Sequence, residues 1–340
     1  MFDTLTDDTL SRLIRPHLPM QYRYLLDIVR VDPEVSAGAG DTASRGAITQ
    51  ALHVLLLADL IDRTPTAAAY VNDLNALGEM LTLDHGALRT IDLAGMGTLP
   101  AGRRAIGRIL EPLGYFENNR YPLDRLGMTG FSYTHRDFPE TLPQFFVSEL
   151  HVERFSHRFQ QAIARVTAES EDPLDVVSID RLLRLRRDQR LPIGEAIELL
   201  PVLVASFDRQ HGDPRLDDYE TLLAESAEAA WIATEGNSFN HATHRVPDLR
   251  KLVAEQRLRG RPMKPKIEVS RCGRIQQTAY RADPVERRFV DGDDLVVRTV
   301  PGSFFEFIQR SAVTDESGGQ RLDLGFDSGN AQGIFKMTAA

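Results

Sequence analysis

Two histidine-containing segments and one glutamate carry the side chains of this sequence that could do chemistry. His85 lies in DHGALRT (84–90), where apolar and polar residues alternate as in a β-strand. Side chains two apart on a strand share a face, so His85, Ala87 and Arg89 would point the same way. A metal on His85 and the guanidinium of Arg89, which start roughly 13 Å apart, could bracket a small dicarboxylic acid. A polar strand at the surface is the alternative interpretation.

A second histidine-containing segment is NHATHR (240–245), which we also expect to be a strand. His241, Thr243 and Arg245 would then share one face, and His244 would lie on the other. We expect His241 to face the site, because its face also carries Thr243 and Arg245, which become candidate substrate contacts. Histidines that merely form hydrogen bonds at the surface remain the alternative.

Glu306 is the strongest local anomaly in the sequence. In GSFFEFIQR (302–310) this single carboxylate stands among aromatic and β-branched residues, a pattern that indicates a buried strand. A carboxylate buried there is costly unless it is paired with a cation or bound to a metal. His85, His241 and Glu306 together form the two-histidine, one-carboxylate set that non-haem Fe(II) uses. The three residues are far apart in the chain, and a solvent-facing or arginine-paired Glu306 remains the alternative.

The composition excludes several classes of protein. With 340 residues, 42 % hydrophobic and 26 % charged, the chain is long enough for two or three structural units and too apolar for wholesale disorder. A net charge of -9 argues against nucleic acid and anionic membranes as partners, because both need a basic surface. The most apolar run, residues 51–60, is too short for a membrane helix, and the N-terminus is acidic. We therefore expect a cytoplasmic protein.

The single cysteine, Cys272, excludes an intrachain disulfide and a cluster of thiolate ligands. A reducing compartment is expected on this ground, and histidines and carboxylates would hold any metal. The sequence makes no prediction of the oligomeric state.

Two stretches that contain strands, separated by helices, would position these residues. Hydrophobic periodicity predicts a helical scaffold over 1–81, a first β module over 82–150, a helical insertion over 151–235, and a second β module with a closing segment over 236–340. The first module would contain short strands at 115–116, 131–134 and 145–147, and a helix would begin at 149 and run to 169. The order of elements in the first module recurs in the second, so we expect one catalytic core built from two similar modules.

Two sets of motifs in this chain are similar to those of known enzymes. FFEFIQR (304–310) and the following GFDSGNAQGIFK (325–336) resemble the C-terminal end of 4-hydroxyphenylpyruvate dioxygenase, where such a strand supplies an iron-binding glutamate and a glycine-rich segment leads into a closing helix. The likeness departs at Asp327, Ser328 and 331–332. DHGALRT, LPQFFVSEL (142–150) and FNHATHRV resemble the DUF1338 family, whose characterised members are 2-oxoadipate dioxygenase/decarboxylases related to vicinal oxygen chelate proteins.

The resemblance covers about residues 20 to 336 and implies both a fold and a site. It implies an α+β fold of the vicinal oxygen chelate type: a partly closed β-barrel made of two β-α-β-β-β modules, with N-terminal helices and a central helical insertion. The family's metal ligands fall on His85, His241 and Glu306, with Fe(II) as the cofactor. Its substrate-binding arginine falls on Arg89.

The resemblance also implies a reaction. A 2-oxo acid, with 2-oxoadipate favoured, would bind Fe(II), O2 would attack its keto carbon, and CO2 and 2-hydroxyglutarate would be the products. An alternative is a non-redox lyase or isomerase of the glyoxalase type on the same scaffold, for which His244 or Glu149 would have to act as the base. A binding protein without activity is disfavoured, because all three ligands and Arg89 are present.

Overall fold

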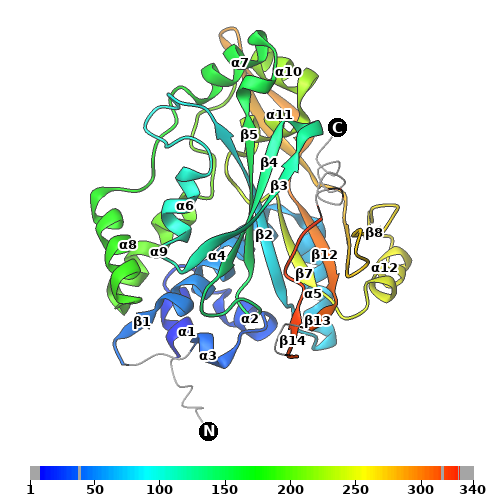
Figure 1. Cartoon of the computed structure of the whole chain (residues 1–340). Coiled ribbons are helices and arrows are strands. Elements are labelled where there is room, and N and C mark those ends of the chain that lie inside the picture. Colours follow the sequence, from blue (N-terminus) through cyan, green and yellow to red (C-terminus); the bar gives the residue numbers. More distant parts are fainter. Residues whose placement is uncertain (1–7, 37–39, 315–317, 328, 330–340) are drawn as a thin grey trace.

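A curled sheet of eight strands forms the centre of the protein (Figure 1). The structure is a computed structural model, and it describes residues 8–36, 40–314, 318–327 and 329. The strand order is β3-β4-β5-β2-β7-β12-β9-β8. The strands are β2 (Leu83–Asp92), β3 (Tyr115–Leu123), β4 (Met128–His135), β5 (Gln144–His151), β7 (His241–Arg245), β8 (Glu268–Val269), β9 (Ile275–Ala279) and β12 (Phe304–Arg310).

The sheet consists of two halves with the same topology. In the first half β2 leads through helix α6 (Arg104–Leu110) to β3, β4 and β5, and β2 pairs in parallel with β5. In the second half β7 leads through helix α12 (Leu249–Leu258) to β8, β9 and β12, and β7 pairs in parallel with β12. The first strands of the two halves, β2 and β7, pair antiparallel and join the halves into one sheet. This arrangement confirms the expected α+β fold with two β-α-β-β-β modules.

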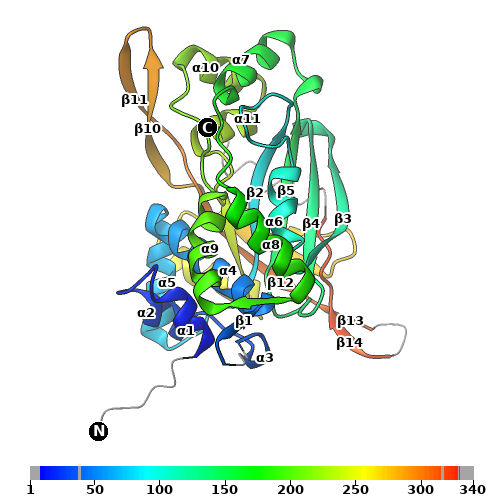
Figure 2. The same cartoon turned by 90° about the vertical axis from the view of Figure 1, so that its left-hand side faces the viewer.

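Helices cover the sheet at both ends and on one face (Figures 1 and 2). They are α1 (Thr9–Ile14), α2 (Tyr22–Ile28), α3 (Pro33–Ser36), α4 (Arg45–Arg63), α5 (Pro65–Leu77), α7 (His157–Thr167), α8 (Val176–Asp188), α9 (Ile193–Ala205), α10 (Leu216–Glu225) and α11 (Ala227–Glu235). The larger hydrophobic core lies between the sheet and helices that include α4, α5 and α9. A second core joins the far ends of β2 and β5 to α7, α10 and α11.

The longest helix, α4, explains how an apolar stretch with a histidine is accommodated. Ser44 precedes α4 and its side chain accepts a hydrogen bond from the backbone N–H of Ala47, which caps the helix. His53 is fully buried, its ring stacks on Phe145 at 4.5 Å between centroids, and its Nε2 lies 2.7 Å from the Tyr115 hydroxyl. Burial lowers the pKa of His53 to about 3, so its imidazole is neutral. The helix therefore packs on the face of the sheet that carries Phe145.

Several predicted elements differ from the structure in extent. The short strands expected at 115–116, 131–134 and 145–147 are strands of eight or nine residues. β3 extends furthest beyond its apolar residues, because it lies at the edge of the sheet and carries polar side chains toward solvent. The helix expected from 149 begins at His157, after the Ser156 cap, since residues 149–151 continue β5. Residues 216–235, within the expected helical insertion, form two helices that meet at Ser226.

Three two-stranded ribbons lie outside the main sheet. They are β1 (Thr42–Ser44) with β6 (Arg190–Pro192), β10 (Pro284–Asp291) with β11 (Asp294–Pro301), and β13 (Ala312–Thr314) with β14 (Gln320–Leu322). The alternating run LVVRTV (295–300) lies in β11, in a hairpin that reaches out beside α10 (Figure 2). Among the described residues, no helix is both long and apolar enough to cross a membrane. Of the predicted closing segment 325–336, residues 328 and 330–336 lie outside the described residues.

Candidate metal centre

His85, His241 and Glu306 meet on three adjacent strands in the middle of the sheet. His85 on β2 lies opposite Thr243 on β7, and Thr243 lies opposite Glu306 on β12. The Nε2 atoms of His85 and His241 lie 3.2 and 3.1 Å from Oε2 of Glu306. One ligand atom from each residue falls within 4.8 Å of the others, and all three side chains are buried. The structure thus brings together three residues that are far apart in the chain.

Strand geometry decides which histidine of β7 faces this centre. The Thr243 hydroxyl donates a hydrogen bond of 2.7 Å to Oε2 of Glu306 and lies 3.1 Å from Nε2 of His85, so Thr243 faces the centre together with His241. His244 points to the other face, where its Nδ1 lies 2.8 Å from the Tyr70 hydroxyl. Burial lowers the pKa of His244 to about 3. The alternation expected for this strand is present.

Asp84 binds the ring nitrogen of His85 that faces away from the centre. Strict alternation would put Asp84 on the opposite face from His85, but the register of β2 against β7 shifts between Leu83 and His85. As a result Oδ1 of Asp84 lies 2.8 Å from Nδ1 of His85. Both oxygens of Asp84 also accept hydrogen bonds from Arg310, at 2.9 to 3.1 Å. A carboxylate on Nδ1 fixes the imidazole so that the lone pair of Nε2 faces the centre.

The electrostatics of the centre favour a cation. Burial alone would raise the pKa of Glu306, but His241 and His85 beside it outweigh burial and hold that pKa well below its usual range. Burial lowers the pKa of His241, whereas for His85 the partners Asp84 and Glu306 outweigh burial and raise the pKa. Arg310 similarly outweighs burial and keeps Asp84 ionised. An ionised carboxylate between two imidazoles is a donor set that suits a divalent transition metal.

A small cavity of ≈ 30 Å³ opens onto this centre. Its lining comprises the three centre residues together with Ala87, Phe146, Ser148, Asn240, Gln277, Phe326 and Asp327. Phe146 and Ser148 pair with Ala87 and Arg89 of β2, so they share the face of His85. Knowledge of this strand pairing would have identified both as lining residues of the site. Gln277 on β9 carries no local signal in the sequence. The volume is far below the several hundred Å³ of a typical ligand site, so a dicarboxylic acid needs this cavity to widen.

Arg89 lies on the same face of β2 as His85, but it is absent from the lining of the small cavity. The side chain is fully buried, and its guanidinium lies over the Trp231 ring at 4.8 Å from the centroid. Burial lowers the pKa of Arg89 to about 10, so the group is still a cation at neutral pH. Its predicted role as the substrate anchor stays a prediction.

Arg245, the third residue on the His241 face, is also absent from that lining. It donates a hydrogen bond of 3.2 Å to the carbonyl oxygen of Glu140 and lies 3.9 Å from Oδ2 of Asp84. Its guanidinium therefore joins the Asp84–Arg310 pair from outside the cavity, and substrate binding by Arg245 stays a prediction.

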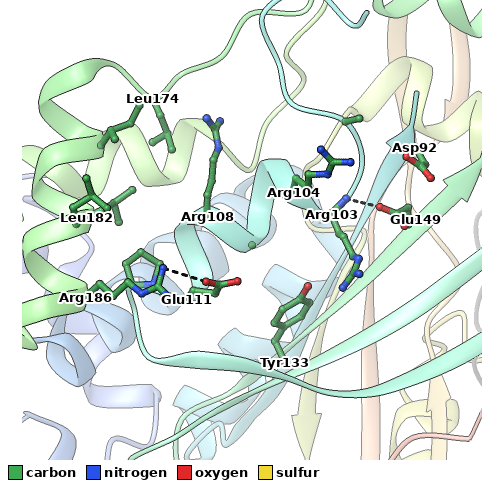
Figure 3. A pocket seen from close by; sticks show the side chains of 15 residues that line it. Asp92, Arg103, Arg104, Arg108, Glu111, Tyr133, Glu149, Leu174, Leu182 and Arg186 are labelled. Atoms are coloured by element: carbon green, nitrogen blue, oxygen red, sulfur yellow. Dashed lines mark hydrogen bonds and ion pairs between the residues drawn. The ribbon is translucent and has the colours of Figure 1, made fainter. Parts of the chain in front are cut away.

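A much larger cavity, ≈ 670 Å³, lies beside α6 and α8 (Figure 3). Glu149 lines it, next in the strand to Ser148, which faces the metal centre. Oε2 of Glu149 accepts a hydrogen bond of 2.7 Å from the backbone N–H of Arg103, at the start of α6. Glu149 and His244, the two bases considered for a non-redox reaction, therefore both point away from the metal centre.

Arginines and leucines form the other walls of this large cavity, but ion pairs occupy several of the arginines. Arg108 donates to both oxygens of Asp172, and Arg186 lies 3.5 Å from Glu111. Asp92, Glu149 and His151 form a second acidic group with ligand atoms within 4.8 Å, in which Asp92 is exposed. Neither these ion pairs nor this second acidic group includes a residue of the buried metal centre.

A curled sheet of two β-α-β-β-β modules, with a His-His-Glu cluster where the first strands meet, places the protein in the glyoxalase-like, vicinal oxygen chelate class of folds. A putative glyoxalase superfamily protein of solved structure from Ralstonia eutropha JMP134 is 50 % identical, over 94 % of this chain and 98 % of that chain, with a TM-score of 0.89. The hydroxyglutarate synthase from Oryza sativa, solved in complex with 2-oxoadipate, has a TM-score of 0.66 and 22 % identity over 89 % of this chain and 97 % of its own, which shows a shared fold.

Sequence comparison identifies the family within that class. The sequence profile of the 2-oxoadipate dioxygenase/decarboxylase family matches residues 53–336, and the chain therefore belongs to this family. A relative described as a chloroplastic/amyloplastic 2-oxoadipate dioxygenase/decarboxylase from Oryza sativa subsp. japonica is 26 % identical over 305 residues, which are 82 % of this chain and 75 % of the relative. A chloroplastic relative of the same description from Arabidopsis thaliana is 23 % identical over 305 residues, which are 82 % of this chain and 74 % of the relative. The chain is an enzyme of this family.

Proposed function

We propose that the protein is an Fe(II)-dependent dioxygenase that decarboxylates and hydroxylates a 2-oxo acid, and that 2-oxoadipate is its substrate. The observation that carries the proposal is that His85, His241 and Glu306 lie on adjacent strands, are buried, and place their ligand atoms close together. Two imidazoles and one carboxylate are the donor set of mononuclear non-haem iron enzymes. Family membership and the 2-oxoadipate complex of a rice protein with the same fold support the choice of substrate.

The three side chains would hold Fe(II), and the bound iron would offer open positions at which a 2-oxo acid and O2 can meet. Asp84 accepts a hydrogen bond from Nδ1–H of His85 and so keeps Nε2 directed at the centre. The Thr243 hydroxyl donates a hydrogen bond to Oε2 of Glu306 and so restricts rotation of that carboxylate. These two contacts preorganise the ligands before metal or substrate arrives.

Arg89 is the residue that we propose to bind the distal carboxylate of the substrate. It lies on the face of β2 that carries His85, with Ala87 between them, and it stays protonated at neutral pH. A guanidinium can bind a carboxylate through two parallel hydrogen bonds, which fixes both distance and orientation. Since the cavity at the centre is only ≈ 30 Å³, substrate must displace part of its lining to reach Arg89.

Aromatic side chains would exclude water once substrate is bound. Phe146 from β5 and Phe326 from the C-terminal segment line the cavity, and their ring centroids lie 4.9 Å apart. A dry site strengthens the electrostatic interactions on which orientation of the substrate depends. In the balanced reaction, 2-oxoadipate and O2 give 2-hydroxyglutarate and CO2.

Oxygen consumption tests the proposal directly. Protein purified anaerobically and loaded with Fe(II) should consume O2 when 2-oxoadipate is added, and shorter or longer 2-oxo acids should give lower kcat/KM. No oxygen uptake with 2-oxoadipate or with any member of such a panel would refute the proposal. Conversion of the 2-oxo acid without oxygen uptake would favour non-redox chemistry.

We also propose a reducing, cytoplasmic location. The support is the single cysteine of the sequence, Cys272, which is exposed and free.

A further inference from the structure

Arg310 ends the strand that carries Glu306 and connects two parts of the site. The two residues are four apart on β12, so they face the same side of the sheet. The Arg310 side chain has 0 % exposure, and its Nε and Nη2 donate hydrogen bonds to the carboxylate of Asp84. Asp84 also binds Nδ1 of His85, so the Asp84 carboxylate bridges the guanidinium of Arg310 and the ring of His85.

The remaining nitrogen of Arg310 binds the backbone of the C-terminal segment. Nη1 donates to the carbonyl oxygens of Asp323 and Gly325, at 2.8 and 2.7 Å. These carbonyls belong to the stretch that delivers Phe326 and Asp327 to the cavity lining. One guanidinium thus holds both the carboxylate behind His85 and the backbone of the segment that covers the cavity.

The C-terminal segment also touches His85 directly. The Phe326 ring stands edge to face with the His85 ring, with centroids 4.9 Å apart and planes at 88°. The same ring lies 5.0 Å from the guanidinium carbon of Arg310. Two weaker hydrogen bonds hold the segment to the first module, from Phe326 N to the Tyr121 hydroxyl (3.2 Å) and from Gln144 to the Leu324 carbonyl (3.3 Å).

These contacts leave Arg310 poorly suited to bind the substrate. Asp84 and the two carbonyls already engage all three nitrogens of its guanidinium. A substrate carboxylate would have to displace a fully buried carboxylate, at a large cost in electrostatic energy. Lysine could keep the charge next to Asp84, but it lacks the planar fork that reaches the carbonyls at the same time.

We propose that Arg310 is a positioning residue that couples closure of the C-terminal segment, residues 323–327, to metal binding at His85. The inference rests on the proposed metal centre. Docking of the segment completes the hydrogen bonds of Arg310, which fixes Asp84 and thereby orients His85 for the metal. By thermodynamic reciprocity, a metal on His85 stabilises the docked segment to the same degree.

Metal binding and amide hydrogen exchange, measured without turnover, test this coupling. Co(II) alone is the probe, because it does not react with O2 in this assay and its absorption spectrum reports coordination. In the wild type, Co(II) should slow exchange in a peptide that covers residues 320–327. Arg310→Gln should weaken Co(II) binding by about 10–100-fold, as loss of outer-shell support commonly does, and should abolish the Co(II)-dependent slowing.

Arg310→Lys separates the coupling from a general structural role. The lysine can still pair with Asp84, so we expect Co(II) affinity near that of the wild type together with loss of the Co(II)-dependent protection. Arg274→Gln is the matched control. Arg274 pairs with the Asp323 side chain, at 2.6 Å, and is not a partner of Asp84. This variant should speed exchange of the segment while Co(II) still slows it.

The outcomes distinguish the coupling from the metal centre itself. Co(II) binding by the wild type without any protection of the segment overturns the coupling alone. Equal Co(II)-dependent protection in the wild type and in both Arg310 variants also overturns it. Failure of the folded wild type to bind Co(II) overturns the metal centre and, with it, the coupling.

Discussion

At the scale of single residues, Glu306 is a buried carboxylate whose charge has to be compensated by its neighbours. Its side chain is buried, in a strand of buried phenylalanines, and its partners at Oε2 are Thr243 and the two imidazoles. An anion in such surroundings is stable only if cations or donors compensate for lost hydration. A metal ion bound by both histidines would supply that compensation.

Replacing one ligand should remove the metal. We expect His241→Gln to lose iron on gel filtration, because one of three donors is gone. His244→Gln is the matched control, since His244 is the neighbouring histidine of the same strand but faces Tyr70. The measurement is the metal content per chain after anaerobic reconstitution. Equal iron in both variants would contradict the assignment of the centre.

Removing the proposed anchor should spare the metal and impair turnover. Arg89→Leu deletes a buried cation while filling part of its volume, so iron content should match the wild type. The kcat/KM for 2-oxoadipate should fall by about 100-fold or more, which corresponds to loss of a charge-assisted pair worth about 3 kcal/mol. Arg245→Leu is the comparison, because Arg245 shares a strand face with His241 but its guanidinium lies beside Asp84 and the Glu140 carbonyl. A larger loss in Arg245→Leu than in Arg89→Leu would move the anchor to Arg245.

The residue types of the centre could be selected from the sequence, but their support could not. His85 and His241 stand out because each shares a strand face with an arginine, and Glu306 because it is the single carboxylate in an aromatic strand. Asp84 does not, because alternation places it on the opposite face, and the register shift that brings it to His85 leaves no trace in the sequence. Arg310 is likewise defined by tertiary contacts alone.

At the scale of elements, β2 and β7 matter most because they join the two halves of the sheet. Both strands are buried over nearly their whole length. Gly86 lies within β2, and a Cβ at this position would come within 2.1 Å of the Phe239 ring. The close approach of that ring to the backbone fixes the position of β2 and therefore of His85.

Gly86→Ala should destabilise the protein for this reason. We expect a loss of roughly 1–3 kcal/mol in the free energy of unfolding, typical of overpacking in a core, together with weaker iron retention. The double variant Gly86→Ala/Phe239→Leu should recover at least about 1 kcal/mol, as coupled neighbours do. Gly107→Ala, where no atom lies within 4 Å of the added Cβ, is the control and should be neutral or stabilising. Urea unfolding of the wild type, Gly86→Ala, Phe239→Leu, the double variant and Gly107→Ala measures these changes, and additive effects at 86 and 239 would contradict the explanation.

Element types were easier to predict than element lengths. Apolar alternation predicts β2, β7 and β12, because these strands lie in the centre of the sheet. Alternation predicts only two residues of β3, because this edge strand carries polar side chains such as Glu117, Asn119 and Arg120. β11 pairs with β10 in a separate ribbon and does not join the main sheet. Alternation predicts a strand but does not predict its pairing partner.

At the scale of the whole molecule, neutral histidines that are buried (His53, His135 and His244) or half-buried (His211) set the response to acid. The pKa is lowered, chiefly by burial, to about 3 for His53 and His244 and to about 4 for His135 and His211. These imidazoles stay neutral in the folded protein while the unfolded chain takes up protons below pH 6.5. Their stabilising contribution is therefore present above that pH and is lost as the pH falls toward 4. The raised pKa of His85 opposes this trend but is a single group.

The free energy of unfolding should thus fall between pH 6.5 and 4.5, with each such histidine contributing up to about 1.4 kcal/mol per pH unit. Urea titrations at several pH values measure the slope. His53→Gln removes one of the four groups, so its slope should be smaller than that of the wild type even though its stability is lower. An unchanged slope in His53→Gln would contradict the account.

The central claim is that the enzyme inserts oxygen from O2 into a decarboxylated 2-oxo acid at the buried centre. Turnover of 2-oxoadipate by the Fe(II)-loaded protein under ¹⁸O₂, followed by mass spectrometry of the product, tests it most directly. The account predicts 2-hydroxyglutarate with label in both its new hydroxyl group and its new carboxylate, formed in equal amount with CO2. A product without oxygen from O2 would contradict it.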